Sequence, residues 1–133
     1  MERAVAYRRK LNVIVDALGK IPASGKHAGS LSALEREGVL HLVQVSVDAA
    51  LDLAAMLVKD AGEAPSDDYH NLEMLVKQNI LPASLGEGLR KLNGLRNAIV
   101  HKYNSFEEAR LFTSLEDIRL TLQTYAELVE GQE

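Results

Sequence analysis

The chain has 133 residues, 47% of them hydrophobic and 26% charged, which excludes a disordered or collagen-like chain and suits one compact domain. Its 15 Lys and Arg against 19 Asp and Glu give a formal net charge of -4, so it is not a general polyanion binder. The absence of Cys excludes disulfides and thiol chemistry and fits a reducing compartment.

No apolar run reaches the roughly 20 residues that a bilayer requires, and no secretory signal begins the chain. The longest nearly uncharged stretch, residues 38–59, still contains Asp48 and Asp52. We therefore expect a single domain over residues 1–133, cytoplasmic and without a membrane partner.

Helical periodicity begins near the N-terminus. Residues 3–18 predict a first helix, because apolar side chains recur there at the three-and-four spacing of one buried face. Gly19 and Pro22 end this helix, and the small residues of 23–29 predict a loop. The basic run 8–10 is most simply the solvated face of this first helix.

The second predicted helix is the longest. Ser32 and Glu35 have the spacing of a capping box at its start. The heptad-like seam that follows comprises Leu40, Val43, Val47, Ala50, Ala54 and Leu57. Gly62 and Pro65 end the helix.

Two further helices follow before residue 104. The first begins near the capping residues 66–68, stops before Pro82, and has an apolar face of Tyr69, Leu72, Leu75 and Val76. The second spans about 83–103 and turns Leu85, Leu89, Leu92, Leu95 and Ile99 inward. Gly94 in its middle predicts the close approach of another helix.

The last predicted helix has one more apolar face with helical spacing. A second capping box at Ser105 and Glu108 precedes it. Its predicted core residues are Leu111, Leu115, Ile118, Leu122, Tyr125 and Val129. The sequence therefore predicts an all-α, up-and-down bundle of four or five helices.

The segment 96–103 is too polar to be explained by the core alone. Asn97 and His101 are four residues apart, so the amide can orient the imidazole on one helix face. Arg96 and His101 are five apart, which places them about 140° apart around a regular helix. They act together only if the helix loosens near His101, or if a second copy of the helix lies across a two-fold axis.

Arginine with histidine suits the cleavage of a phosphodiester without a metal. A guanidinium stabilises charge on phosphate oxygens, and an imidazole exchanges a proton with an attacking or leaving oxygen. The simpler alternative is a solvated Arg96 and a His101 that complements the helix dipole.

A second cluster of polar residues could form a metal site, although this is the weaker of two interpretations. Asp67, Asp68, His70 and Glu73 gather near a predicted helix start and could ligate a divalent ion. Acidic capping residues beside a surface histidine explain them more simply. We expect no metal and no cofactor.

The order Arg96-Asn97-x-x-x-His101-x-Tyr103 resembles the Arg-x4-His-x-Tyr signature of the HepT-like family, within the HEPN superfamily of all-helical domains. The Tyr69-x-x-Leu72 helix and the turn 79–81 before it strengthen the resemblance, which spans almost the whole chain. The resemblance implies a homodimer that joins through the motif-bearing helix and acts as a metal-independent endoribonuclease.

The resemblance also implies roles for single residues. Arg96 would stabilise the phosphate, His101 would act as acid and base, and Asn97 would position them. HepT-like proteins are usually toxins, and their MntA-type nucleotidyltransferase antitoxin would inhibit by adding AMP to the signature tyrosine, here Tyr103. An alternative is a non-catalytic helical dimer that binds or regulates a nucleotidyltransferase.

Basic residues near the motif could contact RNA despite the acidic overall charge. Arg90, Lys91 and Lys102, together with Arg96, could form a local positive strip. We expect this strip to hold the substrate backbone.

Overall fold

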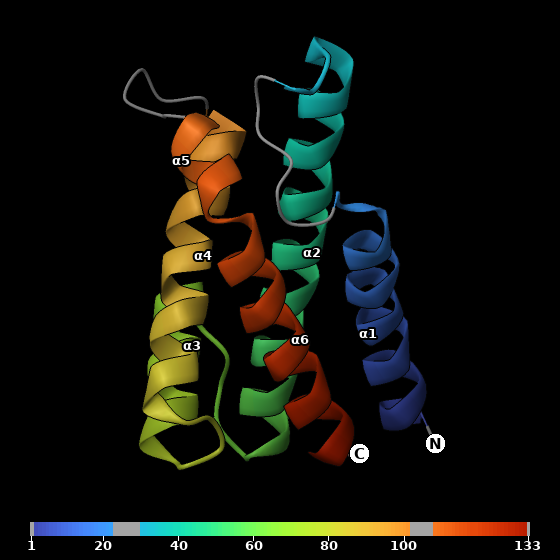
Figure 1. Cartoon of the computed structure of the whole chain (residues 1–133). Coiled ribbons are helices and arrows are strands. Elements are labelled where there is room, and N and C mark those ends of the chain that lie inside the picture. Colours follow the sequence, from blue (N-terminus) through green and yellow to red (C-terminus); the bar gives the residue numbers. More distant parts are fainter. Residues whose placement is uncertain (1, 23–29, 102–107, 133) are drawn as a thin grey trace.

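The computed structural model describes residues 2–22, 30–101 and 108–132 (Figure 1). This part of the chain contains six α-helices and no strand, so the all-α prediction is confirmed. The helices are α1 (Glu2–Lys20), α2 (Ala33–Asp60), α3 (Asp68–Lys77), α4 (Ala83–His101), α5 (Glu108–Thr113) and α6 (Leu115–Gln132). Figure 1 shows α1 at one edge of the bundle and the α3–α4 pair at the other, with α2 and α6 between them.

The described helices outnumber the predicted four or five because the last predicted helix is divided at Ser114. The Ser114 amide donates to the carbonyls of Arg110 and Leu111 at 3.1 and 3.0 Å, and its own carbonyl accepts from Ile118 at 2.9 Å. The chain therefore turns between α5 and α6 with few lost hydrogen bonds. The predicted seam from Leu111 to Val129 is buried along both helices.

Helix α2 forms the centre of the bundle and contacts α1, α3, α4 and α6. Its predicted capping box is present: the Glu35 amide donates to the Ser32 hydroxyl at 3.0 Å, and the Ser32 amide donates to the Glu35 carboxylate at 2.8 Å. By length and composition α2 could cross a membrane, but 56% of its most apolar 18-residue window is buried inside the bundle. All six residues of the predicted seam are buried, which explains this apolar character.

Two polar side chains of α6 fasten it to its neighbours. Tyr125 is fully buried and donates its hydroxyl hydrogen to the Ala50 carbonyl of α2 at 2.9 Å. Arg119 donates to the carbonyls of Leu18, Ile21 and Pro22 at 2.7, 2.9 and 2.9 Å. The guanidinium thereby satisfies one carbonyl in the last turn of α1 and two just beyond its end.

Helices α3 and α4 pack as a close pair, and two predictions about them are wrong. Tyr69 is 44% exposed rather than part of the core face of α3. The close approach occurs at Gly86, where a Cβ atom would overlap Cγ2 of Val76. At Gly94 a Cβ would meet only the Tyr69 hydroxyl, at an ordinary 3.8 Å. The crossing point of the two helices therefore lies two turns earlier in α4 than expected.

Candidate active site

The last turns of α4 carry three of the predicted site residues, Arg96, Asn97 and His101. Helix α4 is regular through His101, its final residue, so the helix does not loosen between Arg96 and His101. Lys102 and Tyr103 follow directly and lie outside the described residues.

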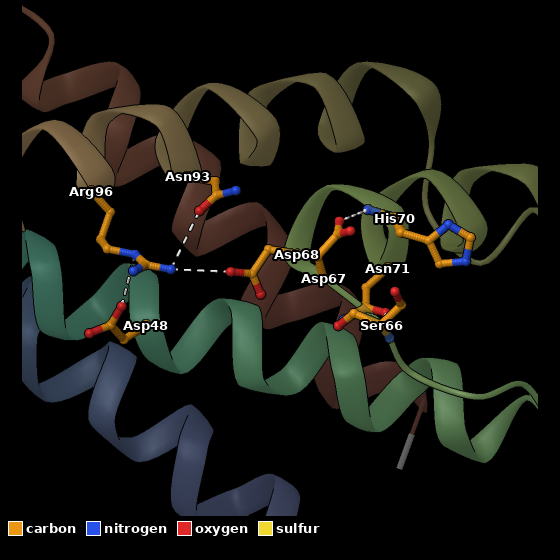
Figure 2. A network of polar contacts seen from close by, with 8 residues as sticks. All are labelled: Asp48, Ser66, Asp67, Asp68, His70, Asn71, Asn93 and Arg96. Atoms are coloured by element: carbon orange, nitrogen blue, oxygen red, sulfur yellow. Dashed lines mark hydrogen bonds and ion pairs between the residues drawn. The ribbon is translucent and has the colours of Figure 1, made fainter.

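The Arg96 side chain leaves α4 and reaches toward α2 and α3, where it lies between two aspartates (Figure 2). Its Nη2 donates to Oδ2 of Asp68 at 3.1 Å and lies 3.5 Å from Oδ1 of Asn93. Its Nε lies 3.1 Å from Oδ1 of Asp48. Only 22% of the side chain is exposed, so a guanidinium from one helix is held by carboxylates from two others.

The closest contacts of Arg96 to its acidic partners involve two of its three guanidinium nitrogens, Nε and Nη2. Its Nε is buried and makes no hydrogen bond, so its 3.1 Å approach to Asp48 is an ion pair without hydrogen-bond alignment. Within the described residues Nη1 makes no hydrogen bond, and it is not among the buried unsatisfied atoms. Nη2 is thus the nitrogen that donates to a carboxylate, while Asp48 balances the charge beside Nε without a hydrogen bond from it.

Asp48 lies on α2 close to two other carboxylates, those of Asp52 and Asp68. Burial raises the pKa of its carboxyl above the ordinary value, and the nearby charges of Asp52 and Asp68 act in the same direction. The cations Arg96 and Lys10 oppose this rise in pKa. Lys10 itself donates to Asp52 at 2.7 Å. The carboxylates around Arg96 therefore outnumber its single positive charge.

His101 and Asn97 occupy different surroundings from Arg96. His101 is exposed at the end of α4, and Asn97 is half-buried one turn earlier. Because α4 is regular and Arg96 turns toward α2 and α3, one chain does not bring Arg96 and His101 side by side. Of the two arrangements considered from the sequence, loosening of α4 near His101 is not seen in the described helix.

The predicted RNA-contacting residues are partly described. Arg90 and Lys91 are exposed on α4. Arg90 lies 3.5 Å from Glu87 and 5.7 Å from the centre of the Tyr69 ring, a cation–π distance. Arg96 adds no net positive charge to this surface, because Asp48 and Asp68 flank it.

The acidic cluster at the start of α3 has structural partners. Asp67 caps α3 by accepting the His70 amide at 2.9 Å, while Asp68 pairs with Arg96. Across residues 2–22, 30–101 and 108–132, no group of three or more acidic or histidine side chains is arranged to hold a metal ion.

Sequence reasoning did not identify Asp48, Asp68 and Asn93 as partners of the motif arginine. Asn93 is buried three residues before Arg96, at a spacing that places both on one helix face. Asp48 directly follows buried Val47 on α2, and an acidic residue beside a buried seam is a signal that a cation lies opposite.

Solved structures with the same fold define the class of this domain. A chain of a toxin–antitoxin complex crystallised with AMP-PNP superposes with a TM-score of 0.83 at 16% identity, covering 93% of this chain and 97% of that one. The tri-AMPylated HEPN toxin of Shewanella oneidensis, in complex with its MNT antitoxin, gives a TM-score of 0.74 at 17% identity, covering 98% and 95%. The domain has the HEPN fold, with an arginine and a histidine at the end of α4.

Sequence comparison then gives the family. The HepT-like ribonuclease family matches residues 24–129. A protein of Archaeoglobus fulgidus named "Putative RNase" is 39% identical over 128 residues, covering 96% of this chain and 93% of that protein. The chain belongs to the HepT-like ribonuclease family, as its signature residues predict.

Proposed function

We propose that this protein is a metal-independent endoribonuclease toxin that acts as a homodimer. Its membership of the HepT-like ribonuclease family and its likeness to toxins of toxin–antitoxin complexes support this function. The observation that carries it is the placement of the signature pair: Arg96 is anchored beside α2 and α3, and exposed His101 ends the same regular helix. Two copies of α4 related by a two-fold axis would bring Arg96 of each protomer beside His101 of the other, which gives two equivalent Arg–His pairs in one shared cleft.

The proposed reaction uses the ribose as the nucleophile. The 2′-oxygen attacks the adjacent phosphorus, a P–O2′ bond forms and the P–O5′ bond breaks, which leaves a 2′,3′-cyclic phosphate and a 5′-hydroxyl. His101 takes the proton from the 2′-hydroxyl and then gives it to the leaving 5′-oxygen. Arg96 stabilises the negative charge on the phosphoryl oxygens, and Asn97 orients the imidazole.

RNA would lie along the basic side chains near the motif. Exposed Arg90 and Lys91 offer positive charge for the RNA backbone, and Lys102 follows His101. Because the chain carries a net charge of -4, these few contacts must account for most of the electrostatic attraction.

We further propose that an MntA-like nucleotidyltransferase inhibits the enzyme. The Tyr103 oxygen would attack the α-phosphorus of ATP and release pyrophosphate, leaving AMP on the tyrosine. Tyr103 is two residues from His101, so the added phosphate charge and bulk would repel and obstruct RNA. Co-expression with the nucleotidyltransferase should increase the intact mass by whole AMP units, and Tyr103→Phe should abolish the increase.

The decisive test is cleavage of RNA by the purified protein in EDTA. Arg96→Lys and His101→Ala should each reduce cleavage by at least about 100-fold, because each removes a group that acts on the reacting phosphate. Circular dichroism should show that both variants are folded. An RNA with 2′-deoxyribose at the cleavage position should resist the wild-type protein.

Matched controls come from the same residue types elsewhere in the bundle. Arg9 is exposed on α1 and His41 is exposed on α2. Arg9→Lys and His41→Ala should therefore cleave like the wild type. Full cleavage by Arg96→Lys and His101→Ala, or no cleavage by the wild type, would contradict the proposed reaction.

One observation favours a second candidate function. Asp48 and Asp68 neutralise Arg96, as they would an arginine that only holds helices together. In that case the protein would be a non-catalytic dimer that binds or regulates the nucleotidyltransferase. Binding of the nucleotidyltransferase without RNA cleavage in EDTA would support this alternative.

A further inference from the structure

The two carboxylates around Arg96 come from parts of the chain far from the signature. Asp68 is 28 residues before Arg96, at the first position of α3. Asp48 belongs to the central helix α2. A long side chain that meets acceptors on two other helices loses much of its rotational freedom, so its guanidinium has a defined plane.

The anchoring determines which donors remain for a substrate. Nη2 donates to Asp68, and Asp48 lies 3.1 Å from Nε without a hydrogen bond from it. Among the described residues Nη1 makes no hydrogen bond, so its donors remain for a phosphoryl oxygen.

The charge of the cluster has a second consequence. One guanidinium between two carboxylates gives a local sum of about one negative charge, which opposes the approach of an RNA phosphate. The carboxylates therefore weaken binding of the ground state while they fix the donor that stabilises the transition state. Weak binding of the ground state with strong stabilisation of the transition state is consistent with catalysis, because only interactions that strengthen in the transition state accelerate the reaction.

We propose that Asp48 and Asp68 are positioning residues that hold the guanidinium of Arg96, Asp68 through the hydrogen bond from Nη2 and Asp48 through its charge beside Nε, and leave Nη1 to donate to the scissile phosphate. The proposal deepens the proposed ribonuclease function and rests on it. Neither carboxylate touches the substrate; each acts through Arg96.

The main test compares Asp68→Asn with Asp67→Asn, two identical charge changes at adjacent residues. Asp67 does not contact Arg96, and asparagine preserves its role as the cap of α3. Asp68→Asn should lower kcat by about 10- to 100-fold, since small misplacements of a catalytic group have effects of that size. Its KM should fall, because a negative charge beside the phosphate site is removed.

A second measurement reports on the guanidinium without any RNA. The Arg96 Nε–H is buried in the native protein, so NMR should show slow exchange of its hydrogen with water. Exchange should quicken in Asp68→Asn and remain slow in Asp67→Asn. If Asp68→Asn does not fold, Asp48→Asn provides the same two measurements, since it removes the other carboxylate.

The combined outcomes separate the two proposals. The positioning role is supported if Asp68→Asn, or Asp48→Asn in its place, shows faster exchange of the Arg96 Nε–H and a lower kcat. Asp67→Asn should then show neither change. Unchanged exchange, or a kcat equal to that of Asp67→Asn, overturns the positioning role and leaves the ribonuclease function intact. A wild-type protein that does not cleave RNA, yet shows slow exchange at Arg96, overturns the ribonuclease function and reduces the carboxylates to structural partners.

Discussion

Val76 on α3 and Gly86 on α4 set the closest approach of these two helices, because a Cβ atom at Gly86 would overlap Cγ2 of Val76. Valine is β-branched and cannot move its methyl group aside without leaving its preferred rotamer. The absence of a side chain at Gly86 is therefore required by the packing of α3 on α4, the pair that carries Asp68 and Arg96.

Replacing this glycine should destabilise the bundle. We expect Gly86→Ala to be less stable than the wild type, because overpacking typically costs about 1–3 kcal/mol and exceeds the gain in helix propensity. Gly38→Ala in α2 is the control, since nothing lies within 4 Å of its added Cβ. That change should stabilise the protein by up to about 1 kcal/mol. Urea unfolding followed by circular dichroism checks both, and equal stabilisation would contradict the packing argument.

The two glycines show what the sequence could and could not predict about the fold. Periodicity and capping residues predicted the helices and most of the core, because both signals are local. They did not predict which glycine meets a neighbour, since that depends on where two helices cross. The spacing of Gly86 from buried Leu89 and Asn93 on α4 was an available signal that Gly86 faces inward.

Tyr125 should contribute to stability in a way that depends on alkaline pH. Tyr125→Phe removes the buried hydrogen bond to the Ala50 carbonyl, so it should cost about 1 kcal/mol at neutral pH. Burial, with a smaller effect from Tyr7, raises the pKa of Tyr125 above its ordinary value of 10.0. Above that pH the unfolded chain loses the tyrosine proton while the folded protein retains it, so wild-type stability falls as pH rises.

Tyr125→Phe lacks this proton, and its stability deficit should therefore shrink as the pH is raised above 10.0. Urea unfolding at a series of pH values measures the difference between the two proteins. Tyr69→Phe, at an exposed position, should match the wild type throughout within about 0.5 kcal/mol. A constant deficit for Tyr125→Phe would mean that Tyr125 ionises alike in both states.

Arg119 should stabilise the end of α1 through the geometry of its guanidinium. Lysine offers one point of charge and cannot donate at once to the carbonyls of Leu18, Ile21 and Pro22. Arg119→Lys should cost about 2 kcal/mol and speed amide exchange in the last turn of α1. Arg110→Lys, at an exposed position of α5, should change neither quantity. A loss of stability without faster exchange in α1 would place the role of Arg119 elsewhere.

The site residues were predictable only where one helix holds them. Arg96, Asn97 and His101 share α4, so their spacing gave their relative directions. Asp48 and Asp68 could not be assigned, because no spacing rule connects residues on α2 and α3 with a residue on α4. The sequence suggested that both acids near residue 67 were capping residues; only Asp67 is the cap, while Asp68 turns toward Arg96.

The regularity of α4 bears directly on how a dimer would build its site. Arg96 turns toward α2 and α3, and His101 is exposed about 140° further around the helix. A site assembled within one chain would need α4 to unwind between these residues, where it is helical. A site that pairs Arg96 of one protomer with His101 of its partner needs no such change.

This pairing predicts that two inactive variants restore each other. Arg96→Ala lacks the guanidinium and His101→Ala lacks the imidazole, so each homodimer should be inactive. In a mixed dimer, one of the two sites combines the intact arginine of one protomer with the intact histidine of the other. Unfolding the variants together at equal amounts and refolding them should yield about a quarter of wild-type cleavage, since half the dimers are mixed and each has one complete site. Mixing without unfolding is the control for slow exchange of protomers. If mixed dimers form, as native mass spectrometry would show, but remain inactive, then each site takes both residues from one chain, and α4 must change its conformation when RNA binds.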